Sequence, residues 1–236
     1  MSLRRSHSPE YKIKLPITKK FVSFRPFSMR SERTLMLATQ SEDMAEITAA
    51  LINTINDCIV TDGIKAEDLP QSEAELLLLN MRSKSVGEKV SIVVTDPDDE
   101  DGKSYPVDVD LSKITVDVAK DFENVITFDD GTVVEFNLPN IKAMAELEDI
   151  DNEFDSTIAV LTQCVKAVTL DEECINRADL KDNEIKDFLL DMSSGDFKLM
   201  NDKFFSKIPQ LSTTVKVKRK DGTIFSLEVS GLAAFF

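Results

Sequence analysis

Four acidic side chains within a short loop form the pattern in this sequence that comes nearest to a metal site. Alternating carboxylates of this kind present oxygen atoms to a hard cation such as calcium. An EF-hand loop that began at the first of them would need Gly at its sixth position and Glu at its twelfth, where this chain has Asp101 and Val107. The sequence therefore favours a solvated hairpin tip, and no metal ligand is predicted. The four residues are Asp96, Asp98, Glu100 and Asp101.

The histidine and cysteine residues give little support for catalysis. The one histidine, His7, lies in an unpatterned polar segment, whereas a catalytic base must be held in a fixed position by its surroundings. The three cysteines, Cys58, Cys164 and Cys174, are widely spaced and odd in number, so we expect buried free thiols rather than disulfides or a zinc site. No glycine-rich phosphate loop is found among the seven glycines. No catalytic residue and no cofactor is predicted.

Composition limits the function further. The 236 residues are 42% apolar and include 14 Phe, which is enough for a substantial core. A net charge of -15 would repel a phosphate backbone, so nucleic acid is not expected as a partner. No apolar run approaches the roughly 20 residues that a membrane span needs, and the first ten residues are polar, so we expect a protein made in the cytosol.

The most completely specified element is a helix over residues 72–87. Ser72 and Glu75 have the spacing of a capping box, and Gly87 is suited to end the helix. The consecutive leucines place apolar side chains almost all the way round, so the helix should be central and buried. One stripe of this helix consists of Ala74, Leu77, Leu78 and Met81.

Other helices follow from apolar residues at alternating intervals of three and four. Ser28 can cap a helix after Pro26, and a second helix ends at Cys58, so residues 28–86 read as a three-helix unit. Residues 139–206 read as a second helical region. The defining residues there are Phe154, Ile158, Leu161, Val165 and Val168, followed by Ile185, Phe188, Leu189 and Met192.

Elsewhere the apolar period is two, which predicts β-hairpins. A three-residue loop at residues 129–131 would place Ile126 opposite Val134, and one at residues 220–222 would place Val217 opposite Phe225. The sequence shows no strand–helix–strand alternation that would build a parallel sheet. We therefore predict an α+β fold in which two helical regions pack with antiparallel β-hairpins.

These patterns divide the chain into five parts. The N-terminal arm and first extended segment cover 1–20, the strand and three-helix unit 21–89, the β-hairpin region 90–138, the second helical region 139–206, and the C-terminal hairpin with its apolar tail 207–236.

Several residues have types that suit protein contacts. Arg25 lies between aromatic residues and is expected either to form a pair within the chain or to contact another subunit. The apolar C-terminus should dock on the protein itself or on a partner. The candidate partner-binding residues are Phe24, Arg25, Phe27, Arg30, Arg82, Lys84, Phe235 and Phe236.

Three blocks of this sequence resemble the T4-type bacteriophage baseplate hub family, whose members are hub subunits or hub assembly factors. The first block is Val22-Ser-Phe-Arg-Pro-Phe-Ser-Met-Arg-Ser-Glu-Arg-Thr-Leu-Met-Leu-Ala, and a helix ending at Cys58 follows. The next are Asp68-Leu-Pro and Leu-Leu-Asn-Met-Arg-Ser-Lys-Ser-Val-Gly-Glu. The strong part of the resemblance covers residues 20–90.

The resemblance implies a non-enzymatic structural or assembly role in the tail of a contractile-tailed phage, carried out by protein–protein binding. The implied partners are other tail and baseplate hub proteins. The protein would be made in the host cytoplasm, and it would either stay in the virion or leave after assembly, while self-association stays open. The alternative is a host-directed binding module or small enzyme with an ion or ligand site at the acidic hairpin tip.

Overall fold

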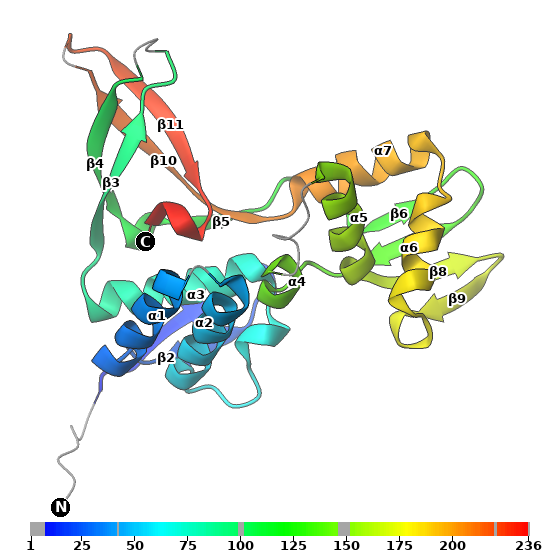
Figure 1. The fold of residues 1–236 in the computed structure, drawn as a ribbon, viewed down its shortest axis with the longest axis horizontal. Coiled ribbons are helices and arrows are strands. Elements are labelled where there is room, and N and C mark those ends of the chain that lie inside the picture. The colour runs from blue at the N-terminus through cyan, green and yellow to red at the C-terminus, as the bar shows by residue number, and fades with distance from the viewer. Residues whose placement is uncertain (1–7, 42, 99–101, 146–151, 220, 236) are drawn as a thin grey trace, which may run out of the picture.

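The computed structural model describes residues 8–41, 43–98, 102–145, 152–219 and 221–235, and it has the predicted α+β architecture. Two lobes lie side by side (Figure 1). The first lobe contains β1 (Tyr11–Lys14), β2 (Phe21–Phe24), α1 (Met29–Ser41), α2 (Met44–Cys58), α3 (Gln71–Ser85), β3 (Lys89–Thr95), β4 (Ser104–Asp110), β5 (Thr115–Asp117), α4 (Ile141–Ala145), β10 (Gln210–Lys218) and β11 (Ile224–Ser230). The second contains β6 (Val125–Thr127), β7 (Val133–Phe136), α5 (Glu153–Cys164), β8 (Val165–Leu170), β9 (Glu173–Asn176), α6 (Asp182–Leu190) and α7 (Ser194–Lys203).

Helix α3 is central to the first lobe, as its leucines predict. Leu78 is fully buried in a cluster with the other helices and the β1–β2 ribbon, whereas Leu79 is fully buried in a second cluster with the hairpins. The predicted capping box is wrong, because the helix already begins at Gln71 and the Glu75 carboxylate accepts a hydrogen bond from the Gln71 side chain at 2.8 Å. The helix is therefore fixed by burial on two sides rather than by that cap.

Residues 28–86 contain three α-helices, and the first two of them start at local polar groups. The Ser31 amide donates to the Ser28 hydroxyl at 3.3 Å, as expected for a cap of α1. The Asp43 carboxylate accepts from the Ala45 amide at 2.8 Å and caps α2. Helix α1 packs against α2, so the two helices cover the lobe on the side away from the hairpins (Figure 1).

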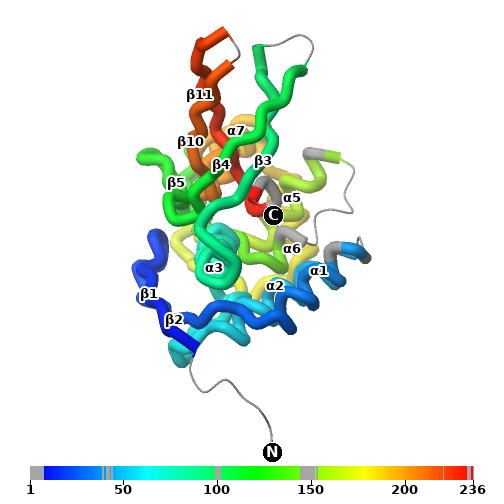
Figure 2. The backbone as a smooth tube through the Cα atoms, turned by 90° about the vertical axis from the view of Figure 1, so that its left-hand side faces the viewer, coloured from blue at the N-terminus to red at the C-terminus, as the bar shows by residue number. Residues whose placement is uncertain are grey.

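Two hairpins, β3–β4 and β10–β11, rise side by side from the first lobe and are called the hairpin arm below (Figure 2). In the second of them Val217 pairs with Phe225 and Val215 with Leu227, so the register predicted from a three-residue turn is confirmed. Strand β5 pairs with the base of β10. The base of the arm is therefore held by the pairing with β5 and by the apolar cluster that contains Leu76 and Leu79 of α3.

The second lobe is a sheet of order β6-β7-β8-β9 with α5, α6 and α7 packed on one face. The predicted turn of the β6–β7 hairpin is confirmed, because Ile126 pairs with Val134 and the Phe128 amide donates to the Thr132 carbonyl at 2.8 Å. Gly131 has the positive φ of 88° that this three-residue loop requires. The hairpins predicted for residues 90–138 are thus shared between the two lobes.

The helix predicted to continue through Val168 is wrong. Helix α5 ends at Cys164, and Val165 begins β8, an inner strand that pairs with β7 and β9. The register shifts between Glu135 and Phe136, and this irregularity lets Val165 and Val168 both reach the core although they are three residues apart. In the sequence, the core residues of this bulged strand therefore have the same three-residue spacing as the core residues of a helix. The region 139–206, predicted as helical, contains β8 and β9 as well.

Candidate partner-binding surface

The strand–helix junction places two of the predicted contact residues in the core. Phe24 is buried, stacks on Tyr11 with ring centroids 5.9 Å apart, and forms a β-bridge with Ile59. Phe27 is also buried, and its amide donates to the Ser85 hydroxyl at 2.9 Å. These aromatic side chains position the junction, and a partner cannot reach them without moving it.

Arg25 forms a pair within the chain, which is one of the two outcomes expected for it. Its guanidinium lies 2.6 Å from the Glu10 carboxylate, and both side chains are about half exposed. A surface pair of this kind contributes only about 0 to 1 kcal/mol to stability. The guanidinium therefore remains accessible to a second protein at little cost to the fold.

Arg82 and Phe235 are brought together although they are 153 residues apart in the sequence. The Arg82 guanidinium donates to the Phe235 carbonyl, and the Phe235 ring is fully buried in the cluster that supports the hairpin arm. The apolar C-terminus thus docks on the protein itself as far as Phe235, and Phe236 lies outside the described residues. Lys84 is ion-paired with Glu88 and lies 5.5 Å from the centre of the Tyr11 ring.

The acidic hairpin tip is occupied by an arginine from the neighbouring hairpin. The Arg219 guanidinium donates to both oxygens of Asp96 and to Asp98, the latter at 2.8 Å. The hydrogen bonds from Arg219 hold the pKa of Asp96 below its usual range. Glu100 and Asp101 lie outside the described residues, and among those described no group of three His, Cys, Asp or Glu side chains could hold a metal ion. The pairing supports a structural role for this tip.

The cysteines have two different environments. Cys58 and Cys164 are buried free thiols, as predicted, and burial raises the pKa of Cys58 to about 11 and that of Cys164 to about 12. Both are therefore protonated at neutral pH and poor nucleophiles. For Cys174 the prediction of a buried thiol is wrong, because this residue is exposed on β9.

A surface on helix α1 includes only one of the predicted contact residues, Arg30. Met29, Met36 and Leu37 are 77%, 56% and 50% exposed, and Arg30 and Arg33 are exposed beside them. Positions 29, 33, 36 and 37 have helical spacing, so these side chains share one face, called the α1 face below. Met and Arg are enriched in protein interfaces, and clustered exposed apolar side chains mark contact sites. The signal in the sequence was the apolar run 35–38, whose exposed side only the fold decides.

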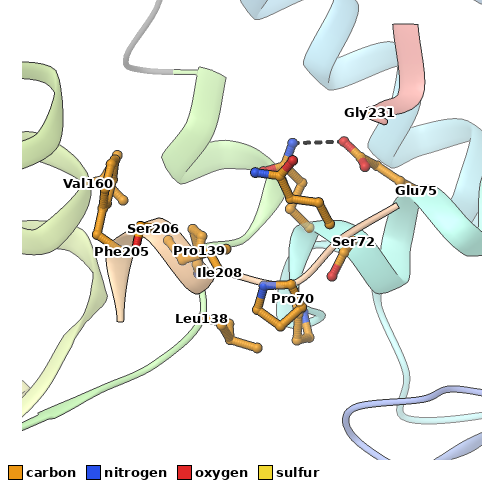
Figure 3. A pocket seen from close by; sticks show the side chains of 13 residues that line it. Pro70, Ser72, Glu75, Leu138, Pro139, Val160, Phe205, Ser206, Ile208 and Gly231 are labelled. Atoms are coloured by element: carbon orange, nitrogen blue, oxygen red, sulfur yellow. Dashed lines mark hydrogen bonds between the residues drawn. The ribbon is translucent and has the colours of Figure 1, made fainter. Parts of the chain in front are cut away.

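A pocket of about 380 Å³ lies between the two lobes (Figure 3). Its walls come from the start of α3, from the connecting segments 138–139 and 205–210, from Val160 of α5 and from Gly231, so they combine distant parts of the chain. Burial raises the pKa of the Glu75 carboxyl on its wall, and the hydrogen bond from Gln71 opposes that rise. Other lining residues are Pro70, Leu138, Pro139, Phe205, Ile208 and Pro209. No sequence pattern indicated this pocket.

Fold and surface together describe an α+β protein whose exposed α1 face is suited to binding another protein. A family model described as T4 bacteriophage base plate protein matches residues 8–236. The chain belongs to this family and is therefore a phage baseplate protein. No curated protein and no solved structure matches it. Among the residues that the structure describes, none of the helices has the length and apolar character needed to cross a membrane.

Proposed function

We propose that this protein is a structural or assembly component of the baseplate hub of a contractile-tailed bacteriophage, and that it acts by binding other tail proteins without catalysing a reaction. Family membership over nearly the whole chain supports the baseplate assignment. The hub assignment is supported by the resemblance of residues 20–90 to hub subunits and hub assembly factors. The binding mechanism is supported by the exposed side chains of the same region.

The α1 face is the observation that carries the binding role. Three large apolar side chains are exposed on one helix, although on the same helix Leu35 packs, partly buried, against the helical cluster and Ala38 is buried. Leaving Met29 and Leu37 in water forgoes the favourable burial that a contact would supply. The family-like block at residues 22–38 ends within this helix, so the resemblance and the exposed surface coincide.

Some of the predicted contact residues are exposed and can touch a partner directly. Others are buried or paired within the chain and hold the exposed ones in position. Arg25 and Arg30 are exposed, and Lys84 is partly exposed, so these cations are offered as direct contacts. Phe24 and Phe27 hold the junction that leads into α1. Arg82 holds the C-terminal turn, Leu232–Phe235, by donating to the Phe235 carbonyl. Phe236 is retained as a proposed contact at the chain terminus.

The proposed sites of action are the host cytoplasm during assembly and the tail baseplate. A hub subunit would remain in the finished particle, whereas an assembly factor would be absent from it. Quantifying the protein in purified virions relative to a known baseplate component distinguishes these two outcomes.

Charge substitution on the α1 face tests the binding role. The double variant Met29→Glu with Leu37→Glu places two carboxylates where an apolar contact is proposed. It should reduce the yield of complete baseplates at least about tenfold in a complementation assay, because buried carboxylates oppose association strongly. Its melting temperature should change little, since surface substitutions shift stability by only about 0.5 kcal/mol.

The matched control introduces the same charges on the hairpin arm, with Val93→Glu and Ile224→Glu. Both side chains are well exposed, so the variant gains the same charge without touching α1. It should support normal particle yield. A normal yield from the folded α1 variant as well would remove the α1 face from baseplate assembly.

A further inference from the structure

The charge of this acidic protein is divided very unevenly along the chain. Residues 1–40 contain nine Lys and Arg against two Asp and Glu, a net charge of +7, so residues 41–236 carry -22. The described basic side chains of the first part lie on β1, on the turn to β2, after β2 and on α1. An acidic protein therefore presents a local basic surface at its N-terminal end.

The β1–β2 ribbon has two chemically different faces. Its inner face pairs Tyr11 with Phe24 and Ile13 with Val22, and these side chains pack in the helical cluster. Its outer face carries exposed Lys12 and Lys14 together with Phe21, which is 55% exposed. We call the outer set of Lys12, Lys14, Phe21 and Ser23 the ribbon face.

The two lysines gather around the exposed ring of Phe21. The Lys12 and Lys14 ammonium groups lie 4.8 Å and 5.7 Å from the centre of that ring, within the range of cation–π attraction. Among the described residues, neither lysine has an acidic partner. The positive charge of the ribbon face is therefore not neutralised by the described part of the chain.

The outer edge of β1 is open within the described structure. β1 pairs with β2 alone in its sheet, whereas the far side of β2 is covered by residues 58–61 through backbone and side-chain hydrogen bonds. Lysines on an open edge strand commonly serve to prevent pairing with other chains. If the lysines only prevent pairing, no added strand should bind to the β1 edge. If they select a partner, an acidic strand should bind, because opposite charges on neighbouring strands attract.

We propose that the β1 edge binds an extended acidic segment of a partner protein, which adds as a strand beside Tyr11–Lys14 and sets its carboxylates against Lys12 and Lys14. This inference rests on the proposed function and names the chemistry of one partner. The backbone groups of β1 supply the hydrogen bonds, as in other cases of strand addition. The lysines select acidic segments and exclude basic ones.

A protein strand fits this surface better than a nucleic acid does. The open backbone edge can be satisfied by another peptide backbone, and the short ribbon offers two cations rather than the long basic track that follows a phosphate backbone. Binding to an oligonucleotide is therefore the competing outcome that the experiment must separate.

The full-length protein is titrated with a peptide of alternating Thr and Glu, with its Thr and Gln counterpart, and with oligothymidylate. The acidic peptide should bind more tightly than the neutral one, and it should slow amide hydrogen exchange in Tyr11–Lys14. Lys12→Glu with Lys14→Glu should weaken that binding at least about tenfold. The control Lys216→Glu with Lys218→Glu reverses two exposed lysines of the same spacing on β10 and should change it less than about twofold.

Four results would overturn the inference. They are failure of the acidic peptide to bind, equal weakening by both double variants, unchanged amide exchange in β1, and tighter binding of oligothymidylate than of the peptide. Complementation with the β1 variant then separates the two proposals. Normal baseplate yield from it removes the ribbon face from assembly, whereas failure of the proposed function would appear as normal yield from the α1-face variant.

Discussion

The two lobes are built from the sequence in opposite ways. The second lobe uses a nearly continuous stretch, and its strands β6, β7, β8 and β9 pair in chain order. The first lobe joins the beginning, the first half and the end of the chain, since Leu15, Leu79 and Phe235 are all fully buried in its two clusters. Long-range contacts of this kind cost more loop-closure entropy, so the first lobe depends on specific interactions between distant segments.

Hydrogen bonds supply several of those long-range interactions in the first lobe. The fully buried Glu73 carboxylate accepts from the Ile17 amide at 2.6 Å and from the Thr18 amide at 2.9 Å, which ties the β1–β2 turn to α3. Arg82 ties the C-terminal turn to the same helix. Helix α3 is therefore both the apolar centre and the anchor for the two ends of the described chain.

The largest effect is expected from Leu78→Asp. This change places an unpaired carboxylate at a fully buried position of α3, at a cost of several kcal/mol out of the roughly 5 to 15 that stabilise a domain. The variant should fail to fold as a soluble protein. The control Leu190→Asp alters a half-exposed residue of the second lobe and should stay soluble. Normal expression and an unchanged melting temperature for Leu78→Asp would contradict the central place of α3.

A smaller effect, and a sharper test of the comparison, comes from removing one buried ring in each lobe. Phe235→Ala and Phe204→Ala should each cost about 3 to 5 kcal/mol, because both rings are fully buried. Hydrogen exchange should accelerate in β3, β10 and α3 for Phe235→Ala. For Phe204→Ala, whose ring stacks 4.6 Å from that of Phe136, it should accelerate in the second lobe. Equal acceleration throughout both lobes in either variant would refute their separate cores.

The smallest effect concerns the pairing of Arg219 with Asp96 at the end of the hairpin arm. The folded-state pKa of Asp96 is lowered by Arg219, so the pair stabilises the arm above the unfolded pKa near 4 and loses that contribution as pH falls through the folded value. Amide exchange at the arm tip, corrected for its intrinsic pH dependence, should therefore show loosening below about pH 4. In Arg219→Ala the tip should already be loose at neutral pH, with a weaker response to acid. A wild-type tip that stays equally protected at pH 2 would argue against the pairing.

The sequence predicted what depends on neighbouring residues. The burial of α3 followed from leucines placed all the way round a helix, and the registers around Gly131 and Gly222 followed from turn geometry combined with apolar alternation. The same reasoning failed at Val165 and Val168, because a bulged strand and a helix can both bring residues three apart to one side. Local period alone could not distinguish the two.

For the candidate site, the sequence identified residue types, and the tertiary structure decided their exposure. Phe24, Phe27 and Phe235 were expected at contacts, yet the fold encloses them, while Met29 and Leu37 are left on the α1 face. The period of a helix fixes which side chains lie together, but it does not say whether another segment or solvent covers them.

What the sequence by itself determined is the central helix, the helices before it and the registers of two hairpins, because side-chain direction follows directly from backbone geometry. Only the tertiary structure brought Arg219 to Asp96, Arg82 to Phe235 and the lysines of β1 to an open edge. Those contacts depend on how distant segments pack. Many different pairings of apolar faces would be compatible with the same local pattern of apolar residues. The three-dimensional arrangement selects one of them and thereby decides which charged groups are paired within the chain and which remain for a partner.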